Sequence, residues 1–539
     1  MFNAQDHTAS DVSRRTFIAG AAAGLGIAAA GVAGVSAHAA ESAASDAKAS
    51  AKADAKASGK IPKYVFLFIG DGMGNEQVQV ASFYKGATEH DGAVVQSPLG
   101  FMGFPHVASV TTFDSSSFCP DSASTATSIA TGHKTLSGTI NMDPETLTES
   151  YETIAEKLHS QKGYKIGVLT SVNMNHATPA AFYAHQSKRS KYYEIGQELA
   201  SSGFEFFAGG AFLGATGDGK DDKLEDLADV AADNGYTVVK TQADAKALEP
   251  GSTGSDRVLI LAETVADGGA MSYDMDAAAD EWRLADYVQK GIDLLTADAK
   301  AEDAGFFMMC EGGKIDWACH ANDAAACIGD VLALDQAVSV AKAFYDEHPD
   351  ETLILVTADH ETGGLGIGYK TTNYDTFLPN LASQTMSYAK FDSDVAADYA
   401  KGNVSFEQAL ADVEKYFGLV AKGSDAAAGM DPAGKNGSLV MTDEELEELR
   451  TAFERTVTVG AGSQAAMSEQ DYELYGSYQP FSMTMCHILN HKSGLDHTTY
   501  AHTGAPVSIW AIGAGAEEFD GSIDNTDIYA KLAALTEVE

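Results

Sequence analysis

Seven short apolar segments without polar alternation recur along this 539-residue chain. Continuous apolar character is typical of strands that are buried on both faces, and segments with helical patterns lie between them. The sequence therefore predicts an α/β fold: a doubly wound domain with a mostly parallel central sheet flanked by helices. The predicted strands are residues 64–69, 165–171, 204–210, 258–263, 305–310, 353–357 and 507–513.

Polar side chains of metal-binding types follow four of the predicted strands. In open α/β sheets the reactive crevice lies beyond the carboxyl ends of the strands, so these residues meet at one edge. Several carboxylates and imidazoles in one place need cations to offset their mutual repulsion and the cost of desolvation. The sequence therefore predicts a site with several metal ions. Its candidate residues are Asp71, His176, Thr178, Glu311, Asp316, His320, Asp359 and His360.

Two of these positions have a competing interpretation. The segment GDGMG around Asp71 is similar to part of a dinucleotide-binding fingerprint, but its third glycine has the wrong spacing and Asp71 would repel a pyrophosphate. Asp316 and His320 are four residues apart, which places both on one helical face, either as a surface pair or as ligands of one ion. The apolar residues between them indicate burial, which favours the ligands.

His502 and Arg189 are harder to assign from spacing. His502 precedes the predicted strand 507–513, so its participation depends on how the fold carries it to the site. Arg189 is either a solvated surface residue or a planar clamp for a tetrahedral oxyanion. We interpret the neighbouring His185 as a structural residue.

The segment CPDSASTATSIATGHKT, residues 119–135, carries several hydroxyl groups. The pair Asp121-Ser122 after Pro120 is typical of a helix start, where a side-chain oxygen accepts a free backbone N–H. The local sequence alone does not separate a helix cap from a nucleophile.

The net charge and the cysteines restrict the classes of partner and the compartment. A formal net charge of −42 argues against nucleic acid and against an anionic membrane surface, because both bind basic patches. An anionic substrate would then need local positive charge from metal ions or arginine. The cysteines are too few and odd in number for a disulfide framework, so we interpret all of them as buried, unreactive thiols. They are Cys119, Cys310, Cys319, Cys327 and Cys486.

Residues 1–39 have the pattern of a twin-arginine export signal. Arg14 and Arg15 precede an apolar stretch, and the small residues around His38 form a cleavage pattern. Retention as an anchor is the alternative, but the stretch is rich in Ala and Gly and barely long enough to span a bilayer. We expect cleavage, a low-complexity linker over residues 40–60, no stable membrane span afterwards, and a periplasmic, cell-surface or extracellular location.

Six motifs occur in the order found in the alkaline phosphatase family, and the chain resembles that family over residues 63–370 and 497–535. They are GDGMG, PDSASTATS, HATPAAFYAHQSKR, EGGKIDWACH, TADH and AHTG. The resemblance implies an enzyme that hydrolyses small phosphate monoesters through a phosphoserine, with two Zn²⁺ ions and a third ion that is usually Mg²⁺.

The resemblance also assigns a role to each matching position. Ser122 corresponds to the nucleophile and Arg189 to the phosphate clamp. The ligands that it implies are Asp316, His320 and His502 for the first zinc, Asp71, Asp359 and His360 for the second, and Asp71, Thr178 and Glu311 for the third ion.

Two positions depart from the best-known bacterial pattern. His176 stands where an Asp is found, and an imidazole there suits Zn²⁺ or Co²⁺ better than Mg²⁺ at the third site. Trp317 stands where a Lys is found, which removes a cation that could hold phosphate through water. The second change predicts weaker binding of the product.

Residues 371–496 do not match the family's core and interrupt a catalytic domain formed by residues 61–370 and 497–539. Capping boxes at residues 405–408 and 442–445 precede amphipathic patterns, which predicts a helical insertion subdomain. We expect it to roof the site, adjust the substrate range or form a homodimer contact.

Two alternative functions remain at this stage. One is a phosphodiesterase or sulfatase of the same metal-dependent superfamily, and the other is a non-catalytic phosphate-binding surface protein. Arg189 beside a serine favours monoesters, because a second ester group would displace an oxygen that the guanidinium binds. The complete set of ligands argues against a protein without catalysis.

Overall fold

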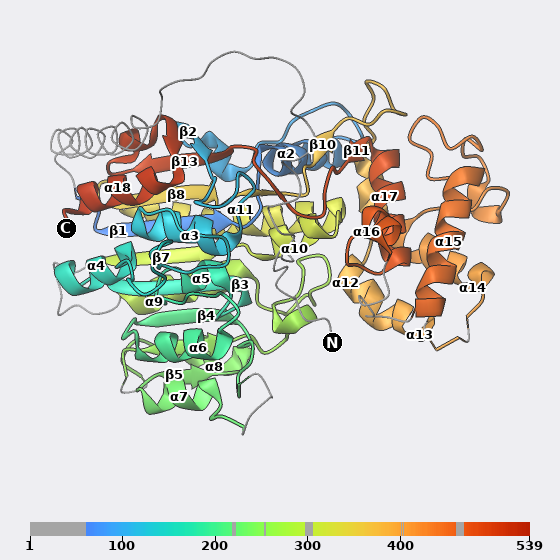
Figure 1. Cartoon of the computed structure of the whole chain (residues 1–539). Coiled ribbons are helices and arrows are strands. Elements are labelled where there is room, and N and C mark those ends of the chain that lie inside the picture. Colours follow the sequence, from blue (N-terminus) through green and yellow to red (C-terminus); the bar gives the residue numbers. More distant parts are fainter. Residues whose placement is uncertain are drawn as a thin grey trace, which may run out of the picture.

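The computed structural model describes residues 61–217, 223–252, 255–296, 305–399, 401–402, 404–459 and 468–539. Its centre is a ten-stranded sheet with the order β14-β2-β13-β8-β1-β7-β3-β4-β6-β5 (Figure 1). The expected α/β architecture is confirmed. The strands are β1 Tyr64–Gly70, β2 His106–Thr111, β3 Lys165–Asn173, β4 Phe206–Gly210, β5 Thr237–Val239, β6 Val258–Leu261, β7 Phe306–Glu311, β8 Thr352–Ala358, β13 Val507–Gly513 and β14 Gly521–Asp524.

All seven predicted strands occur, and three further strands were not predicted. The side chains of β2 alternate between buried and exposed, β5 has only three residues, and β14 is largely exposed. None of the three presents the continuous apolar run that identified the others. The signal and linker predicted for residues 1–60 lie outside the described residues.

The strand β13 runs against its neighbours β8 and β2, whereas the other strand pairs of this sheet are parallel. The start of β13 therefore lies at the same edge as the carboxyl ends of β1, β7 and β8. The short strand β12 His502–Thr503 pairs there with β9 Glu361–Thr362, so that His502 lies opposite Thr362. The reversal of β13 is what brings His502 to the predicted site.

Helices pack on both sides of the sheet (Figure 1). One group consists of α2, α9 and α11, and the other of α3, α4, α5 and α18. Among the described residues only α11 is long and apolar enough to cross a membrane, and it packs against α9 and β8 in the core. The bounds are α2 Asn75–Glu89, α3 Ser122–Thr131, α4 Ile154–Lys162, α5 Ala177–Ala180, α6 Tyr192–Ser201, α7 Leu227–Asp233, α8 Gln242–Ala247, α9 Leu284–Thr296, α10 Lys314–His320, α11 Ala324–Glu347 and α18 Asn525–Thr536.

Among the described residues, six further α-helices lie between the paired strands β10 Gly366–Ile367 and β11 Leu495–Asp496. Figure 1 shows them grouped beside the sheet, on the side of α10. The two capping boxes form as predicted, at the starts of α14 and α15. Aromatic side chains in edge-to-face contact, among them Phe391, Tyr399, Phe453 and Phe481, hold this group together. The helices are α12 Tyr388–Phe391, α13 Ala397–Tyr399, α14 Phe406–Phe417, α15 Asp443–Val459, α16 Glu469–Tyr475 and α17 Pro480–Ser493.

Candidate active site

Ser122 is the first residue of α3, and Asp121 is the cap of that helix. The Asp121 carboxylate accepts the Ser124 N–H at 3.0 Å, so the side chain of Asp121, and not that of Ser122, caps the helix. Ser122 Oγ lies 3.2 Å from His360 Nε2, and the residue is only 2% exposed. Helix cap and candidate nucleophile are therefore two adjacent residues.

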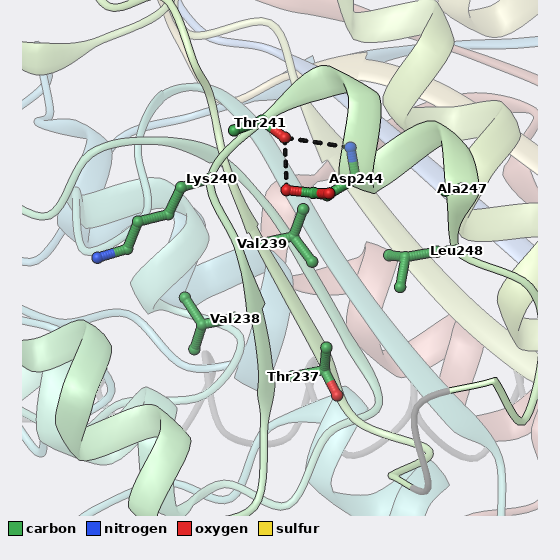
Figure 2. Close-up of a pocket in the computed structure, with 8 residues that line it drawn as sticks. All are labelled: Thr237, Val238, Val239, Lys240, Thr241, Asp244, Ala247 and Leu248. Atoms are coloured by element: carbon green, nitrogen blue, oxygen red, sulfur yellow. Dashed lines mark hydrogen bonds between the residues drawn. The ribbon is translucent and has the colours of Figure 1, made fainter.

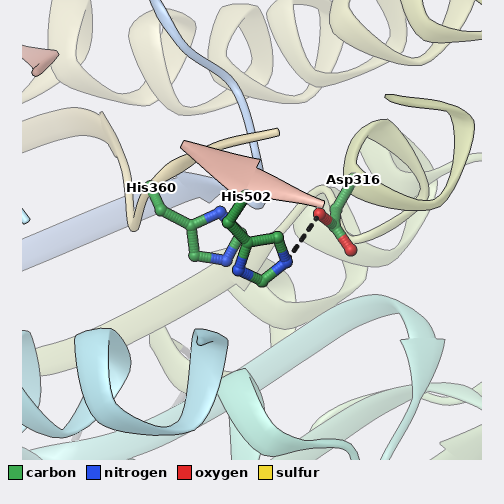
Figure 3. A group of neighbouring side chains, drawn as sticks. All are labelled: Asp316, His360 and His502. Atoms are coloured by element: carbon green, nitrogen blue, oxygen red, sulfur yellow. Dashed lines mark ion pairs between the residues drawn. The ribbon is translucent and has the colours of Figure 1, made fainter. Parts of the chain in front are cut away.

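A first group of ligand atoms comes from Asp316, His360 and His502, whose atoms all lie within 4.8 Å of one another (Figure 3). His502 Nε2 lies 3.6 Å from Asp316 Oδ1 and 3.0 Å from His320 Nε2. His320 Nε2 in turn lies 3.3 Å from Asp316 Oδ2. Two imidazole nitrogens and a carboxylate thus converge on one point, as the ligands of one ion do.

Backbone carbonyls fix the orientation of both imidazoles. The Nδ1–H of His320 donates to the Tyr500 carbonyl and that of His502 to the Pro120 carbonyl, each at 2.6 Å. Each ring therefore turns its Nε2 toward the group, and Nε2 is the nitrogen that a metal ion would bind in this tautomer.

A second group consists of Asp71, Asp359 and His360, again with ligand atoms within 4.8 Å of one another. His360 Nε2 lies 3.4 Å from Asp71 Oδ1 and 3.2 Å from Asp359 Oδ2. His360 belongs to both groups, so they are adjacent. Gly72 has a φ of +70°, and a Cβ there would lie 2.7 Å from the Thr362 hydroxyl, so the tight turn after β1 requires glycine.

Asp71 also connects the second group to Thr178 and Glu311. Thr178 Oγ1 donates to Asp71 Oδ2 at 3.2 Å, and Thr170 donates a short hydrogen bond to Glu311. Asp71 Oδ1 and Glu311 Oε1 are buried and accept no hydrogen bond within the described part of the chain. Two buried carboxylate oxygens without a donor fit a cation as their partner.

The charges of the groups support the same interpretation. Burial raises the pKa of Asp71 well above its usual range, and raises the pKa values of Glu311 and Asp359 to about 7 each, with neighbouring carboxylates adding to the effect. Burial lowers the pKa of His360 to about 4 and that of His502 well below its usual range. Asp316 and His320 differ: burial opposes their charged forms, but the contact between the two side chains lowers the pKa of Asp316 and raises that of His320. The neutral His360 beside Asp71 and Asp359, which resist ionisation, forms a donor set that a divalent ion would complete.

Arg189 is held at the start of α3. Its NH1 donates to Asp121 Oδ2 at 2.9 Å, and its side chain is 17% exposed. Burial opposes ionisation of Asp121, but the Arg189 guanidinium together with the backbone N–H groups of Gly138 and Ser124 lowers the pKa of that carboxyl. Arg189 NH2 lies 3.2 Å from His176 Nε2, so His176 faces Arg189, and it belongs to neither of the two ligand groups.

Sequence reasoning missed two threonines that contact the ligands. Thr362 Oγ1 donates to Asp316 Oδ1 at 2.6 Å, and Thr125 Oγ1 donates to Asp359 Oδ2 at 3.2 Å. Thr125 follows Ser122 by three residues and so shares its helical face, which was the available signal. No sequence pattern marked Thr362.

Two predictions about residues away from the site have different outcomes. His185 contacts Glu156 and Glu198, each at 3.4 Å, which confirms its structural role. The prediction that all cysteines are buried is wrong for Cys119, which is exposed because it lies in the loop before α3.

A separate cavity of about 540 Å³ lies between β5 and α8, where it is lined by residues 237–241, Asp244, Ala247 and Leu248 (Figure 2). None of the candidate ligands borders it. It is not part of the candidate active site.

Comparisons with known proteins show the family and the fold. A family model described as alkaline phosphatase matches residues 62–538. Alkaline phosphatase 3 of Bacillus subtilis (strain 168) is 28% identical over 475 residues, which cover 86% of this chain and 87% of that protein. The solved structure of a cold-active alkaline phosphatase from Shewanella sp. has a TM-score of 0.67 and 25% identity, with 88% of this chain and 99% of that chain covered.

The fold is also similar to that of an alkaline phosphatase from the Antarctic bacterium TAB5. The TM-score is 0.57 at 22% identity, and 89% of this chain and 99% of that chain are covered. Two variants of that protein, in which one histidine is replaced by Glu or Asp, hold Mg in a site called M3.

Proposed function

Because the chain belongs to the alkaline phosphatase family, we propose that it hydrolyses phosphate monoesters to inorganic phosphate and an alcohol through a phosphoserine at Ser122. One observation carries the proposal: Ser122 Oγ lies 3.2 Å from His360 Nε2, and His360 belongs to both groups of candidate ligands. A nucleophile in that position is adjacent to both ions that these groups would hold.

We assign one Zn²⁺ ion to Asp316, His320 and His502, a second Zn²⁺ to Asp71, Asp359 and His360, and a third divalent ion, Mg²⁺, Zn²⁺ or Co²⁺, to Asp71, Thr178 and Glu311. When bound, such ions supply Lewis acidity, which favours the ionised serine oxygen and stabilises the departing oxygen. The donor set fits them, since it offers neutral imidazoles and carboxylate oxygens without a hydrogen-bond donor.

The protein's own groups position the reactants. In the first step Ser122 Oγ gives its proton to solvent water and bonds to phosphorus, while the bond from phosphorus to the ester oxygen breaks and that oxygen takes a proton from water to leave as the alcohol. The guanidinium of Arg189, held by Asp121, binds the non-bridging oxygens as a planar fork. The free N–H groups at the start of α3 add positive potential beside the same oxygens. In the second step water attacks the phosphoserine and releases phosphate.

The test measures turnover of an aryl phosphate, an aryl phosphodiester and an aryl sulfate, with and without a chelator. We expect preferential turnover of the monoester, loss of activity with the chelator, and a fall of roughly 10³-fold or more for Ser122→Ala. Ser128→Ala is the matched control, because Ser128 lies on the same helix and its hydroxyl bonds only the Ser124 carbonyl. Full monoesterase activity in the Ser122→Ala variant would contradict a mechanism through a phosphoserine at Ser122.

The same assay separates the alternatives. Higher turnover of the diester or the sulfate would identify a phosphodiesterase or a sulfatase, and phosphate binding without turnover would identify a non-catalytic protein. Metal analysis of the active protein identifies the third ion, for which His176 favours Zn²⁺ or Co²⁺.

We further propose export by the twin-arginine route, on the pattern around Arg14 and Arg15. Replacement of both arginines by lysine should retain the chain in the cytoplasm. Unchanged export would contradict this assignment.

A further inference from the structure

Asn322 lies in the short loop between α10 and α11, two residues after the candidate ligand His320, and is only 3% exposed. Its φ of +49° is left-handed, which asparagine tolerates better than most residues. A local role at the end of α10 accounts for this conformation and for two hydrogen bonds, each of 3.0 Å, that its backbone N–H and its Nδ2 donate to the Cys319 carbonyl. Three further bonds of Asn322 reach residues distant in sequence, and the local role does not account for them.

The first of these bonds ties the end of α10 to the segment that leads to His502. Asn322 Nδ2 donates to the Thr499 carbonyl at 3.0 Å. The next carbonyl along the segment, that of Tyr500, accepts the Nδ1–H of His320 at 2.6 Å. Two adjacent carbonyls are thus bound by two residues at one helix end, which fixes the segment relative to α10. This arrangement holds His320 Nε2 at 3.0 Å from His502 Nε2.

The other two bonds come from helix α17, at the end of the insertion. Asn490 Nδ2 donates to the Asn322 carbonyl at 2.7 Å, and His487 Nε2 lies 3.2 Å from Asn322 Oδ1. Because Asn322 Nδ2 already faces two carbonyls, its Oδ1 is the acceptor, and His487 therefore donates from Nε2. Burial lowers the pKa of His487 to about 4, so the imidazole is neutral and this bond joins two uncharged groups. Both polar atoms of the Asn322 side chain thus have partners, and the partner of Oδ1 belongs to the insertion.

The neighbouring Asp323 attaches the same loop to the start of the insertion. Its buried carboxylate accepts hydrogen bonds from Gln384 Nε2 and from the Tyr388 N–H, each at 2.9 Å, and also caps α11 through the Ala326 N–H at 3.0 Å. Residues near both ends of the insertion therefore hold the loop that directly follows the ligand His320. From this position the packing of the insertion affects the orientation of that ligand.

We propose that Asn322 is a positioning residue for the first zinc site and that it links helix α17 of the insertion to the ligand His320. The proposal rests on the proposed function, which assigns Asp316, His320 and His502 to one ion. Asn322 is not a ligand; it acts by holding the segment whose Tyr500 carbonyl orients the His320 ring. Helix α17 in turn holds Asn322. The insertion thereby keeps the ligands of the first site in place before the ion binds.

Four variants test this link. Asn322→Gly removes the side chain without straining the backbone, because glycine adopts a φ of +49° readily. Asn373→Gly is the matched control, since Asn373 also has a left-handed φ, of +56°, but is exposed. His487→Leu removes the donor that α17 offers to Asn322 Oδ1. His487→Gln retains a donor, because its amide nitrogen takes the place of the imidazole Nε2.

The measurement is Zn²⁺ binding to the metal-free full chain, in competition with a chelating dye that resolves each site. The first site is identified as the one that His320→Ala abolishes. We expect Asn322→Gly to weaken this site by roughly 10-fold and to leave the other sites unchanged. His487→Leu should weaken it by roughly 3-fold, as expected from the loss of one hydrogen bond, and His487→Gln should restore it. The double variant Asn322→Gly/His487→Leu should bind Zn²⁺ like Asn322→Gly, because His487 acts through Asn322.

The pattern separates positioning from a general loss of stability, which would weaken all sites together. Unchanged affinity in Asn322→Gly, an equal loss at every site, or the same loss in Asn373→Gly would overturn the positioning role. Additive effects in the double variant, or no rescue by His487→Gln, would overturn the link through α17. A wild-type protein without a Zn²⁺ site that depends on His320 would overturn the metal assignment and the positioning role with it. A wild-type protein that binds Zn²⁺ there but does not turn over aryl phosphate would overturn only the proposed function.

Discussion

In the metal-free protein, the single carboxyl group of Glu311 should lower the free energy of unfolding as the pH rises. Glu311 lies at the end of β7, has one oxygen without a donor, and has its pKa raised to about 7 by burial. Glu311→Gln replaces this group by one of similar shape that does not titrate, and the glutamine oxygen can still accept the Thr170 hydroxyl. The variant therefore removes only the cost of ionising the buried acid.

The sign and the size of the effect follow from linkage. The pKa of Glu311 is higher in the folded than in the unfolded chain, so its contribution to stability is complete below about pH 4.5 and is lost as the pH rises through 7. Between pH 5.5 and 8 the loss amounts to roughly 2 kcal/mol. As the pH rises from 5.5 to 8, the free energy of unfolding of the metal-free Glu311→Gln protein should therefore increase by this amount relative to that of the metal-free wild type.

The measurement is urea unfolding of chelator-treated wild type and Glu311→Gln at both pH values. The difference between the two proteins cancels the opposing effects of the buried histidines, which titrate in both. A difference in unfolding free energy that is the same at pH 5.5 and pH 8 would refute the reasoning. With metal restored, the order should reverse, because the variant then lacks a ligand charge.

Three further changes test the site. Thr362→Val removes the hydrogen bond to Asp316 and should weaken Zn²⁺ binding by roughly 10- to 100-fold in a competition with a chelating dye; unchanged affinity would mean that Thr362 does not support the ligand. Arg189→Lys loses the planar fork and should raise the phosphate inhibition constant by about 10-fold, and a constant within error of wild type would contradict the clamp. Trp317→Lys adds a cation and should tighten phosphate inhibition by about 5-fold; little tightening would refute the view that Trp317 weakens product binding.

The central strands and the residues that follow them could be predicted from the sequence. β1, β7 and β8 are buried on both faces, and the need to bury both faces leaves a continuous apolar run that is readable without a structure. Asp71 and Asp359 follow such runs directly, so their meeting at one edge is a consequence of parallel pairing.

The orientation of β13 and the contacts made by single hydroxyls could not be predicted. An apolar run has the same composition in either direction, so the sequence of β13 does not show that it is antiparallel, and the position of His502 depends on that direction. Thr362 contacts Asp316, which is distant in sequence, and no local pattern encodes this contact. Its role becomes visible only once the chain is folded.

The antiparallel β13 also has a consequence for the order in which the protein is completed during synthesis. His502 follows β1, β7 and β8 in the chain, whereas Pro120, whose carbonyl orients it, is made early. A nascent chain that already contains β1, β7, β8 and His360 holds the second group but not the complete first one. Under the proposed metal assignment, the first group can therefore be filled only after β12 has been made, and a chain truncated before His502 should bind less metal than the full chain.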